Sequence, residues 1–261
     1  MSKEKCVCGS ASYHLLFRKG PHSIEKCSSC GISRTFPVPK PNYAGEKEKH
    51  LNYLLERKKV EGFMEELLEE VKKFKPSGKL LDVGCSVGIL LELAERSGYS
   101  VKGVEPSRIA AAEAKKALGK KAVKEALFED SGFPPRYFDL VVFNHVFEHF
   151  QEPAAALKEA KRILRKKGVV VIGVPDFESR LAGIKKQNWV YLNPEEHVWH
   201  FGHKILPALL SRNGFRVLKV KINKPFFPIS LNPFILFDKI FYQFLLNWRE
   251  GDTIIVIAAK K

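Results

Sequence analysis

Long apolar runs are absent from this sequence of 261 residues. No stretch reaches the roughly 20 uninterrupted apolar residues that a membrane-spanning helix requires. Residues 1–5 lead into cysteines and not into an apolar run, so we expect no secretory signal and a cytoplasmic location.

Acidic residues are scarce relative to basic ones. The chain has 29 Asp and Glu against 44 Lys and Arg, which gives a formal net charge of +15. Hydrophobic residues make up 45% and charged residues 28%, which is typical of a globular protein and excludes a disordered chain or a fibre. A basic excess of this size also suggests a nucleic-acid partner, if the basic residues lie close together.

The basic excess lies at the two ends of the chain. Residues 1–45 carry a net charge of +5, residues 46–75 are neutral, residues 76–179 carry +2 and residues 180–261 carry +8. A basic surface built from the two ends favours an anionic partner, and the alternative is a scattered, solvated charge distribution.

Cysteine is rare, and four of the five cysteines form two close pairs, each followed by a glycine that permits a tight turn. The pairs are Cys6 with Cys8 and Cys27 with Cys30. Four thiolates satisfy a closed tetrahedral site, so this spacing predicts a structural zinc ribbon over residues 1–45. Two disulfides are the alternative, which the absence of a secretory signal disfavours. His14 and His22 lie between the pairs as substitute ligands.

A linking segment follows the ribbon. Residues 36–41 are rich in proline and predict a stiff connector. Residues 46–75 have apolar side chains at helical spacing and predict one amphipathic helix, which we expect to pack on the next domain without chemistry of its own.

A glycine-rich turn follows the first strand of the central region. The strand covers residues 79–84, the apolar helix 89–96 follows the turn, and a second strand over residues 100–104 ends in Glu105. This arrangement binds adenosine-type ligands at the carboxyl ends of parallel strands. Glu105 is placed to accept hydrogen bonds from both ribose hydroxyls.

The turn differs from the dinucleotide fingerprint G-x-G-x-x-G, because Asp82 precedes Gly84 by two residues and Gly88 follows four later. It resembles the D/E-x-G-x-x-x-G motif of class I S-adenosylmethionine (SAM)-dependent methyltransferases, with Ser86 in place of the usual middle glycine.

Later segments follow the order of that family, with predicted strands at 122–126, 137–143, 169–174, 214–223 and 252–260. Residues 6–220 resemble the branch that begins with a cysteine ribbon and a proline-rich connector, which is associated with small-molecule, sugar or cell-envelope modification. The resemblance implies an α/β fold with a Rossmann-like seven-stranded sheet, mostly parallel with the last strand antiparallel. It makes residues 76–261 the methyltransferase domain, with acceptor-side elements at about 177–250.

The resemblance also implies a cofactor site for SAM, with S-adenosylhomocysteine as product. Glu105 would hold the ribose, Leu127 and Phe128 would flank the adenine, and Asn144 and His145 would face the methionine moiety. The cofactor-binding residues that it implies are Asp82, Gly84, Cys85, Ser86, Gly88, Glu105, Pro106, Leu127, Phe128, Asn144 and His145.

Histidines are concentrated on the acceptor side, since five of the eight lie between positions 145 and 203. Methyl transfer from a sulfonium requires an aligned acceptor and, for a hydroxyl or carbon acid, removal of a proton. Histidine titrates near working pH, so His197 is the first candidate for general base, followed by His200 and His145. The alternative is that these histidines only hydrogen-bond loops.

Two further interpretations concern the same region. His149 is expected to be structural. A metal site made of His197, His200 and His203 is not expected, because neighbouring proline and glycine favour a loop.

The segment 226–248 is rich in phenylalanine but too short and too charged to cross a bilayer. It would contact a membrane peripherally, cover a hydrophobic acceptor, pair with a second subunit, or pack in the core.

The sequence therefore predicts a SAM-dependent methyltransferase acting on a small-molecule, sugar or lipid-linked acceptor that is anionic. An RNA methyltransferase that uses the basic ribbon is the first alternative. It is disfavoured because residues 144–147 read Asn-His-Val-Phe and not the Asn/Asp-Pro-Pro-Tyr type that positions a flipped base. A non-catalytic SAM-binding scaffold is the second alternative.

Overall fold

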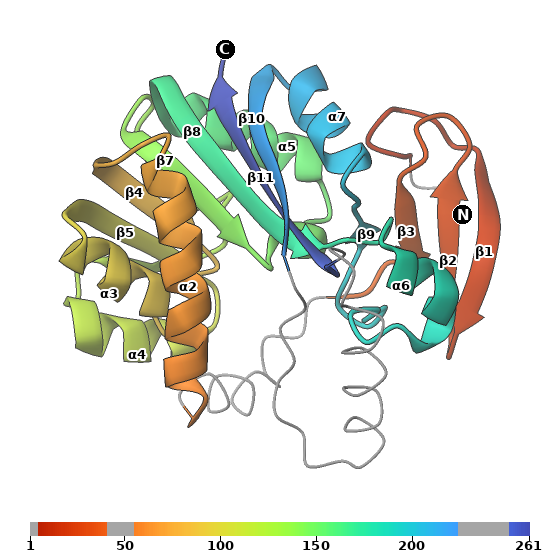
Figure 1. Cartoon of the computed structure of the whole chain (residues 1–261), viewed down its shortest axis with the longest axis horizontal. Helices are drawn as coiled ribbons and strands as arrows, with labels where there is room; N and C mark the ends of the chain where they lie inside the picture. Colours follow the sequence, from red (N-terminus) through yellow and green to blue (C-terminus); the bar gives the residue numbers. More distant parts are fainter. Residues whose placement is uncertain (1–4, 41–54, 224–250) are drawn as a thin grey trace.

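Seven strands form the central sheet of the chain, in the order β10-β11-β8-β7-β4-β5-β6 (Figure 1). The computed structural model describes residues 5–40, 55–223 and 251–261. The strands are β4 Gly78–Val83, β5 Tyr99–Glu105, β6 Val123–Glu125, β7 Phe138–Asn144, β8 Leu164–Pro175, β10 Phe215–Asn223 and β11 Thr253–Lys260.

Strand direction confirms the predicted sheet. β4 pairs in parallel with β5 and β7, β5 with β6, and β7 with β8. β11 runs antiparallel to both of its neighbours, β8 and β10. The carboxyl ends of β4, β5 and β7 therefore meet at one edge, where the predicted cofactor residues are located.

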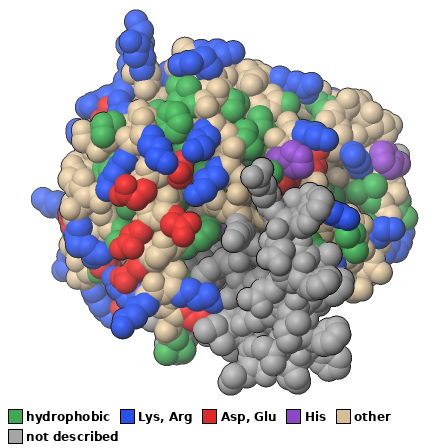
Figure 2. Space-filling view, in the orientation of Figure 1, with side chains coloured by type: hydrophobic (Ala, Val, Ile, Leu, Met, Phe, Trp, Pro, Cys, Tyr) green, Lys and Arg blue, Asp and Glu red, His purple; other side chains and the backbone are tan. Residues whose placement is uncertain are grey.

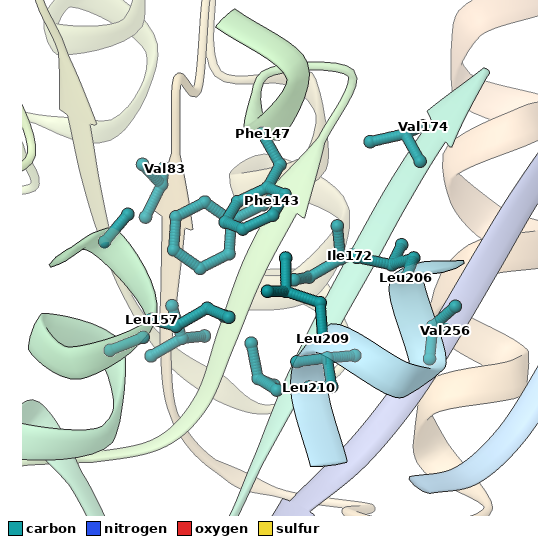
Figure 3. Packing of buried hydrophobic residues seen from close by; sticks show 14 of the residues in the cluster. Val83, Phe143, Phe147, Leu157, Ile172, Val174, Leu206, Leu209, Leu210 and Val256 are labelled. Carbon is teal, nitrogen blue, oxygen red and sulfur yellow. The ribbon is translucent and has the colours of Figure 1, made fainter. Parts of the chain in front are cut away.

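Helices cover both faces of this sheet (Figure 1). One face carries α2 Arg57–Lys72, α3 Ile89–Arg96 and α4 Arg108–Leu118, and the other carries α5 Pro153–Ile163 and α7 Ile205–Arg212. Alternate residues of a strand face opposite sides of the sheet. Val169 and Val171 of β8 therefore belong to a first buried cluster, under α2, α3 and α4, while Val170 and Ile172 belong to a second cluster, under α5 and α7. Figure 3 shows the second cluster, in which Phe143, Phe147 and Ile172 meet leucines of α5 and α7.

The N-terminal unit is an antiparallel sheet completed by a distant segment. Its strands are β1 Tyr13–Lys19, β2 His22–Cys27 and β3 Ser33–Phe36. The short strand β9, Trp199–His200, adds to β3, and the backbone N–H of Thr35 donates to the carbonyl of Val198 at 2.9 Å. The ribbon is therefore joined to the acceptor-side region by main-chain hydrogen bonds.

The predicted linking helix is described from Arg57 to Lys72 and packs on α3, as expected. Its buried side chains are Val60, Leu67, Leu68 and Val71. The segment 226–248 lies outside the described residues. Among the helices of the described ranges, none has the length and apolar character needed to cross a membrane.

Candidate cofactor and acceptor sites

The turn after β4 depends on backbone conformations that favour glycine. Gly84 has φ +70°, and a Cβ there would lie 2.7 Å from a methyl group of Val146. Gly88, which precedes α3, has φ +89°. Ser86 also lies in the left-handed region, with φ +47°. The turn therefore closes tightly and directs its backbone toward the sheet edge.

Glu105 fixes this turn from the end of the neighbouring strand. Its carboxylate is buried, with Oε2 accepting from the backbone N–H of Ser86 and Oε1 accepting from the backbone N–H of Ser107, both at 2.8 Å. Ser107 precedes α4, so one side chain connects the glycine-rich turn to the start of the next helix.

Asp82 lies beside Glu105 near the end of β4, and it is 4% exposed. Burial, and then the charge of Glu105, raise the pKa of the Asp82 carboxyl well above its usual value. Two neighbouring buried carboxyl groups create a site that favours a cationic ligand.

The first pocket opens at this edge with about 30 Å³ of free space, roughly one water molecule. It is lined by Val60, Met64, Asp82, Gly84, Cys85, Ser86, Val87, Ile89, Leu90 and Asn144. The Asn144 amide donates to the Met64 sulfur at 3.7 Å, while Asn144 Oδ1 is buried without a partner. Five predicted cofactor residues are thus brought together. The sequence did not predict that α2 lines this pocket. The helical spacing of apolar residues indicates which face of a helix is buried, but not what that face contacts.

The predicted adenine neighbours are placed differently from one another. Leu127 is 42% exposed, whereas the Phe128 ring packs edge-on against Phe143 and Phe150 in the core. Phe128 is therefore a core residue and does not line the first pocket. Pro106 is half-buried at the end of β5.

A second cavity of about 250 Å³ adjoins the end of β7. It is lined by His145, Glu148, His149, Pro175, Val190, Tyr191, Asn193, Glu196 and His197. Asn144 borders the first pocket and His145 borders the second, so consecutive residues of one turn separate the two spaces. His145 has φ +53°, and its backbone N–H donates to the carbonyl of Gly173 at 2.8 Å.

Glu148 lies among the histidines of the second cavity and is 2% exposed. Its Oε1 is 3.7 Å from His145 Nδ1 and 4.0 Å from His197 Nε2. Burial acts to raise the pKa of Glu148, but the neighbouring histidines, His145 first, outweigh it and lower the value to about 2. Burial lowers the pKa of His197 to about 4 against the opposing effect of Glu148. Sequence reasoning missed Glu148, although its position next to His149 after the fourth strand was a usable signal.

His200 and His203 do not line the second cavity, although the centroid of the His200 ring lies 6.4 Å from that of the His197 ring. His200 is buried on β9, and its Nε2 is 2.9 Å from the Thr35 hydroxyl, so it joins the ribbon to the main domain. Burial lowers its pKa to about 3. His203 Nδ1 lies 2.8 Å from Asp176 Oδ2. Of the three candidate bases, only His145 and His197 line the cavity, and His200 does not.

The four ribbon cysteines converge at one end of the N-terminal sheet, with sulfur atoms within 4.8 Å of one another. The Cys6–Cys30 and Cys8–Cys27 sulfur distances are 3.4 and 3.7 Å, and all five cysteines of the chain are free. Sulfurs bound to one tetrahedral zinc at about 2.3 Å are about 3.8 Å apart, so this arrangement suits a metal.

Basic and acidic side chains are mixed on the face of the molecule seen in Figure 2. Figure 2 shows Lys and Arg side chains spread over the visible face, with acidic side chains gathered over α2. This face carries no single basic tract of the kind that follows a nucleic-acid backbone.

Comparison with known proteins places the central region in a family. Residues 55–220 match the family described as a methyltransferase domain. An uncharacterized methyltransferase of Oceanobacillus iheyensis is 26% identical over 206 residues, which cover 78% of this chain and 86% of that protein. A ubiquinone biosynthesis O-methyltransferase of Yersinia enterocolitica is 33% identical over 98 residues, 35% of this chain and 40% of that protein.

Solved structures agree with this assignment at the level of the fold. A SAM-dependent methyltransferase of Thermotoga maritima, described as a possible histamine N-methyltransferase, superposes with a TM-score of 0.61 at 23% identity, covering 84% of this chain and 97% of that one. A SAM-dependent methyltransferase of Archaeoglobus fulgidus gives a TM-score of 0.57 at 22% identity, with 80% and 99% covered. The chain therefore belongs to the methyltransferase-domain family and has the fold of SAM-dependent methyltransferases.

Proposed function

We propose that the chain transfers a methyl group from SAM to a small-molecule, sugar or lipid-linked acceptor that is anionic. The observation that carries this proposal is the adjacency of the two spaces. The turn at Asn144 and His145 separates a pocket lined by the buried Asp82 from a cavity lined by histidines. A donor on one side of this turn would face an acceptor on the other.

The residues of the first pocket fit SAM chemically. The cofactor carries positive charge on its sulfonium and amino groups, which suits the buried pair of Asp82 and Glu105. The unpartnered Asn144 Oδ1 offers an acceptor for an amino group, and Glu105 would hold the ribose hydroxyls. The bound cofactor supplies an electrophilic methyl group; this chain supplies its orientation.

Proton removal is assigned to a histidine of the second cavity. His197 and His145 both border it, so either imidazole would reach an acceptor hydroxyl there. Burial lowers the pKa of His197 to about 4, so its ring is neutral near pH 7 and its unprotonated nitrogen can accept a hydrogen bond from an acceptor hydroxyl. His200 is not proposed as the base, because Thr35 holds it in the shared sheet.

The acceptor class is inferred from charge and from relatives. The net charge of +15 favours an anionic compound, and relatives named ubiquinone biosynthesis O-methyltransferases support oxygen as one acceptor atom. We also propose that the four ribbon cysteines hold a structural zinc ion, on the basis of their sulfur distances.

Incubation of the protein with methyl-labelled SAM and cell extract, followed by separation of aqueous, lipid and RNA fractions, tests the proposal. We expect label in the aqueous or lipid fraction, and less of it with the variant His197→Ala or His145→Ala. The exposed His14 provides the matched control, His14→Ala, which should retain full labelling. Label confined to RNA would contradict the proposed acceptor class, and SAM binding without any product would favour a scaffold.

A further inference from the structure

The second cavity brings together three side chains that match a metal site and that no comparison assigns. One ligand atom from each of Glu148, His149 and His197 lies within 4.8 Å of the other two. Glu148 and His149 come from the short helix η2, Phe147–His149, and His197 comes from the loop before β9. Two imidazoles and a carboxylate are a common donor set for divalent transition metals.

The carboxylate of Glu148 is the second, independent observation. The residue is 2% exposed, and its Oε2 is buried without a hydrogen-bond partner. A buried charged oxygen with no partner is unfavourable unless a cation or a hydrogen-bond donor lies next to it. The other oxygen, Oε1, lies 3.7 Å from His145 Nδ1 and 4.0 Å from His197 Nε2, and both distances are beyond hydrogen-bond length. The buried carboxylate of Glu148 is therefore in an environment that a bound cation would stabilise.

The orientation of His149 supports the same conclusion. Its Nδ1 lies 3.1 Å from the main-chain carbonyl oxygen of Glu196. A carbonyl oxygen can only accept, so Nδ1 carries the proton and Nε2 keeps its lone pair. Metal-ligating histidines are held in this way, with the other ring nitrogen donating to a carbonyl or carboxylate.

We propose that Glu148, His149 and His197 bind a divalent transition-metal cation such as Mn²⁺, Fe²⁺, Co²⁺ or Zn²⁺ in the second cavity. Ligand atoms at about 2.1 Å from one tetrahedral ion are roughly 3.4 Å apart. The three ligand atoms lie within 4.8 Å of one another, so binding draws them together by up to about 1.4 Å. The cavity of about 250 Å³ leaves room for an acceptor next to the ion.

The use of such an ion rests on the proposed function. A cation between Glu148 and His197 would bind an oxygen of the acceptor and lower the pKa of a hydroxyl there. An ion at this position would also attract an anionic acceptor. His197 would then act as a ligand, and His145 would be the histidine left to take up the proton.

Binding of Mn²⁺ to the full chain, already supplied with zinc, tests the site without acceptor or turnover. Mn²⁺ prefers oxygen and nitrogen ligands and does not compete for four thiolates. Asp176, Glu178 and His203 form another such group within the described residues, so the part of the electron paramagnetic resonance signal that the Glu148 and His197 variants lose reports the site proposed here. We expect about one Mn²⁺ per chain, and at least a roughly tenfold weaker affinity in Glu148→Gln and in His197→Gln.

The matched control is Glu196→Gln, because Glu196 lines the same cavity and its side chain is outside the ligand set. This variant should bind Mn²⁺ as the parent does, while unchanged SAM affinity of all variants shows that they fold. The proposal is overturned if the parent binds no Mn²⁺, Co²⁺ or Zn²⁺ beyond the cysteine site, or if Glu148→Gln leaves binding unchanged. Metal binding without labelled product in any fraction would instead contradict the proposed function and leave the metal site standing.

Discussion

Glu105, at the end of β5, has a structural role as well as a proposed role in cofactor binding. The carboxylate accepts from two backbone N–H groups, of Ser86 and Ser107, and so holds the glycine-rich turn in place, in addition to its proposed contact with the ribose. Each hydrogen bond to a charged group contributes about 1.5–3 kcal/mol. We therefore expect Glu105→Ala to raise the dissociation constant for SAM by at least about tenfold in calorimetric titration.

The control for this variant is Glu125→Ala, an exposed glutamate at the end of the next strand, which should bind SAM normally. Glu105→Gln keeps the shape of the side chain and one carbonyl acceptor, so its effect should be intermediate. Normal affinity in Glu105→Ala would remove this residue from the cofactor site.

His200 makes stability dependent on pH. In the folded chain its pKa is about 3, because burial disfavours the charged ring, whereas the unfolded value is about 6.5. The contribution of the neutral, buried His200 ring to the free energy of unfolding is complete above pH 6.5, and it is lost as the pH falls from 6.5 toward 3. At pH 5 the loss is about 2 kcal/mol. We expect His200→Gln to reduce the difference in unfolding free energy between pH 7.5 and pH 5 by about that amount, measured by urea denaturation.

The comparison uses differences between two pH values, so any constant cost of the substitution cancels. His14→Gln, which changes an exposed histidine of the same sheet, should keep the parent's pH dependence. An unaltered pH dependence in His200→Gln would assign the acid sensitivity to other groups.

At the level of elements, α2 performs two tasks along its length. Leu67, Leu68 and Val71 are buried near its end, while Val60 and Met64 border the cofactor pocket. The free space there, about 30 Å³, is far below the roughly 300 Å³ or more of a typical small-molecule pocket. We therefore expect the first half of α2 to shift when SAM binds.

Hydrogen exchange measures this shift. On addition of SAM we expect altered exchange over residues 57–66 and little change over residues 67–72, because Val60 and Met64 border the pocket whereas the buried side chains of the second group do not. Adenine alone, which lacks the methionine moiety, serves as the control and should leave the first half of the helix unaffected. Uniform change along α2 would argue against a divided helix.

At the level of the whole molecule, the ribbon and the main domain form one packing unit. Cys6, Cys27 and Ile32 belong to the same buried cluster as Phe143 and the leucines of α7. β9 completes the ribbon sheet, and the loop before it carries His197. Loss of metal from the cysteines should consequently loosen the acceptor cavity as well.

Cys27→Ser tests this coupling. We expect zinc content to fall from about one ion per chain toward zero, and exchange to rise at residues 33–36 and 197–200. Cys85→Ser, which alters the fifth and separate cysteine, should keep its zinc. Full protection of residues 197–200 after zinc loss would show that β9 is held without the ribbon.

Much of the fold follows from local sequence patterns. Apolar strands of five to seven residues alternating with helices, and a glycine turn preceded by an acid, are local features. They place Asp82, Gly84 and Glu105 at one sheet edge because parallel strands align their carboxyl ends. The short strand β9 escaped prediction because two residues carry no periodicity.

By itself the sequence determined the sheet, the turn and the cysteine spacing, since each depends on residues close together in the chain. Tertiary structure decided where each histidine lies, because the sequence alone does not distinguish one imidazole from another. His197 lines the cavity beside Glu148, whereas His200 lies in the ribbon sheet, where its ring contacts the Thr35 hydroxyl. These contacts join segments 49 to 165 positions apart, and only packing in three dimensions brings such segments together.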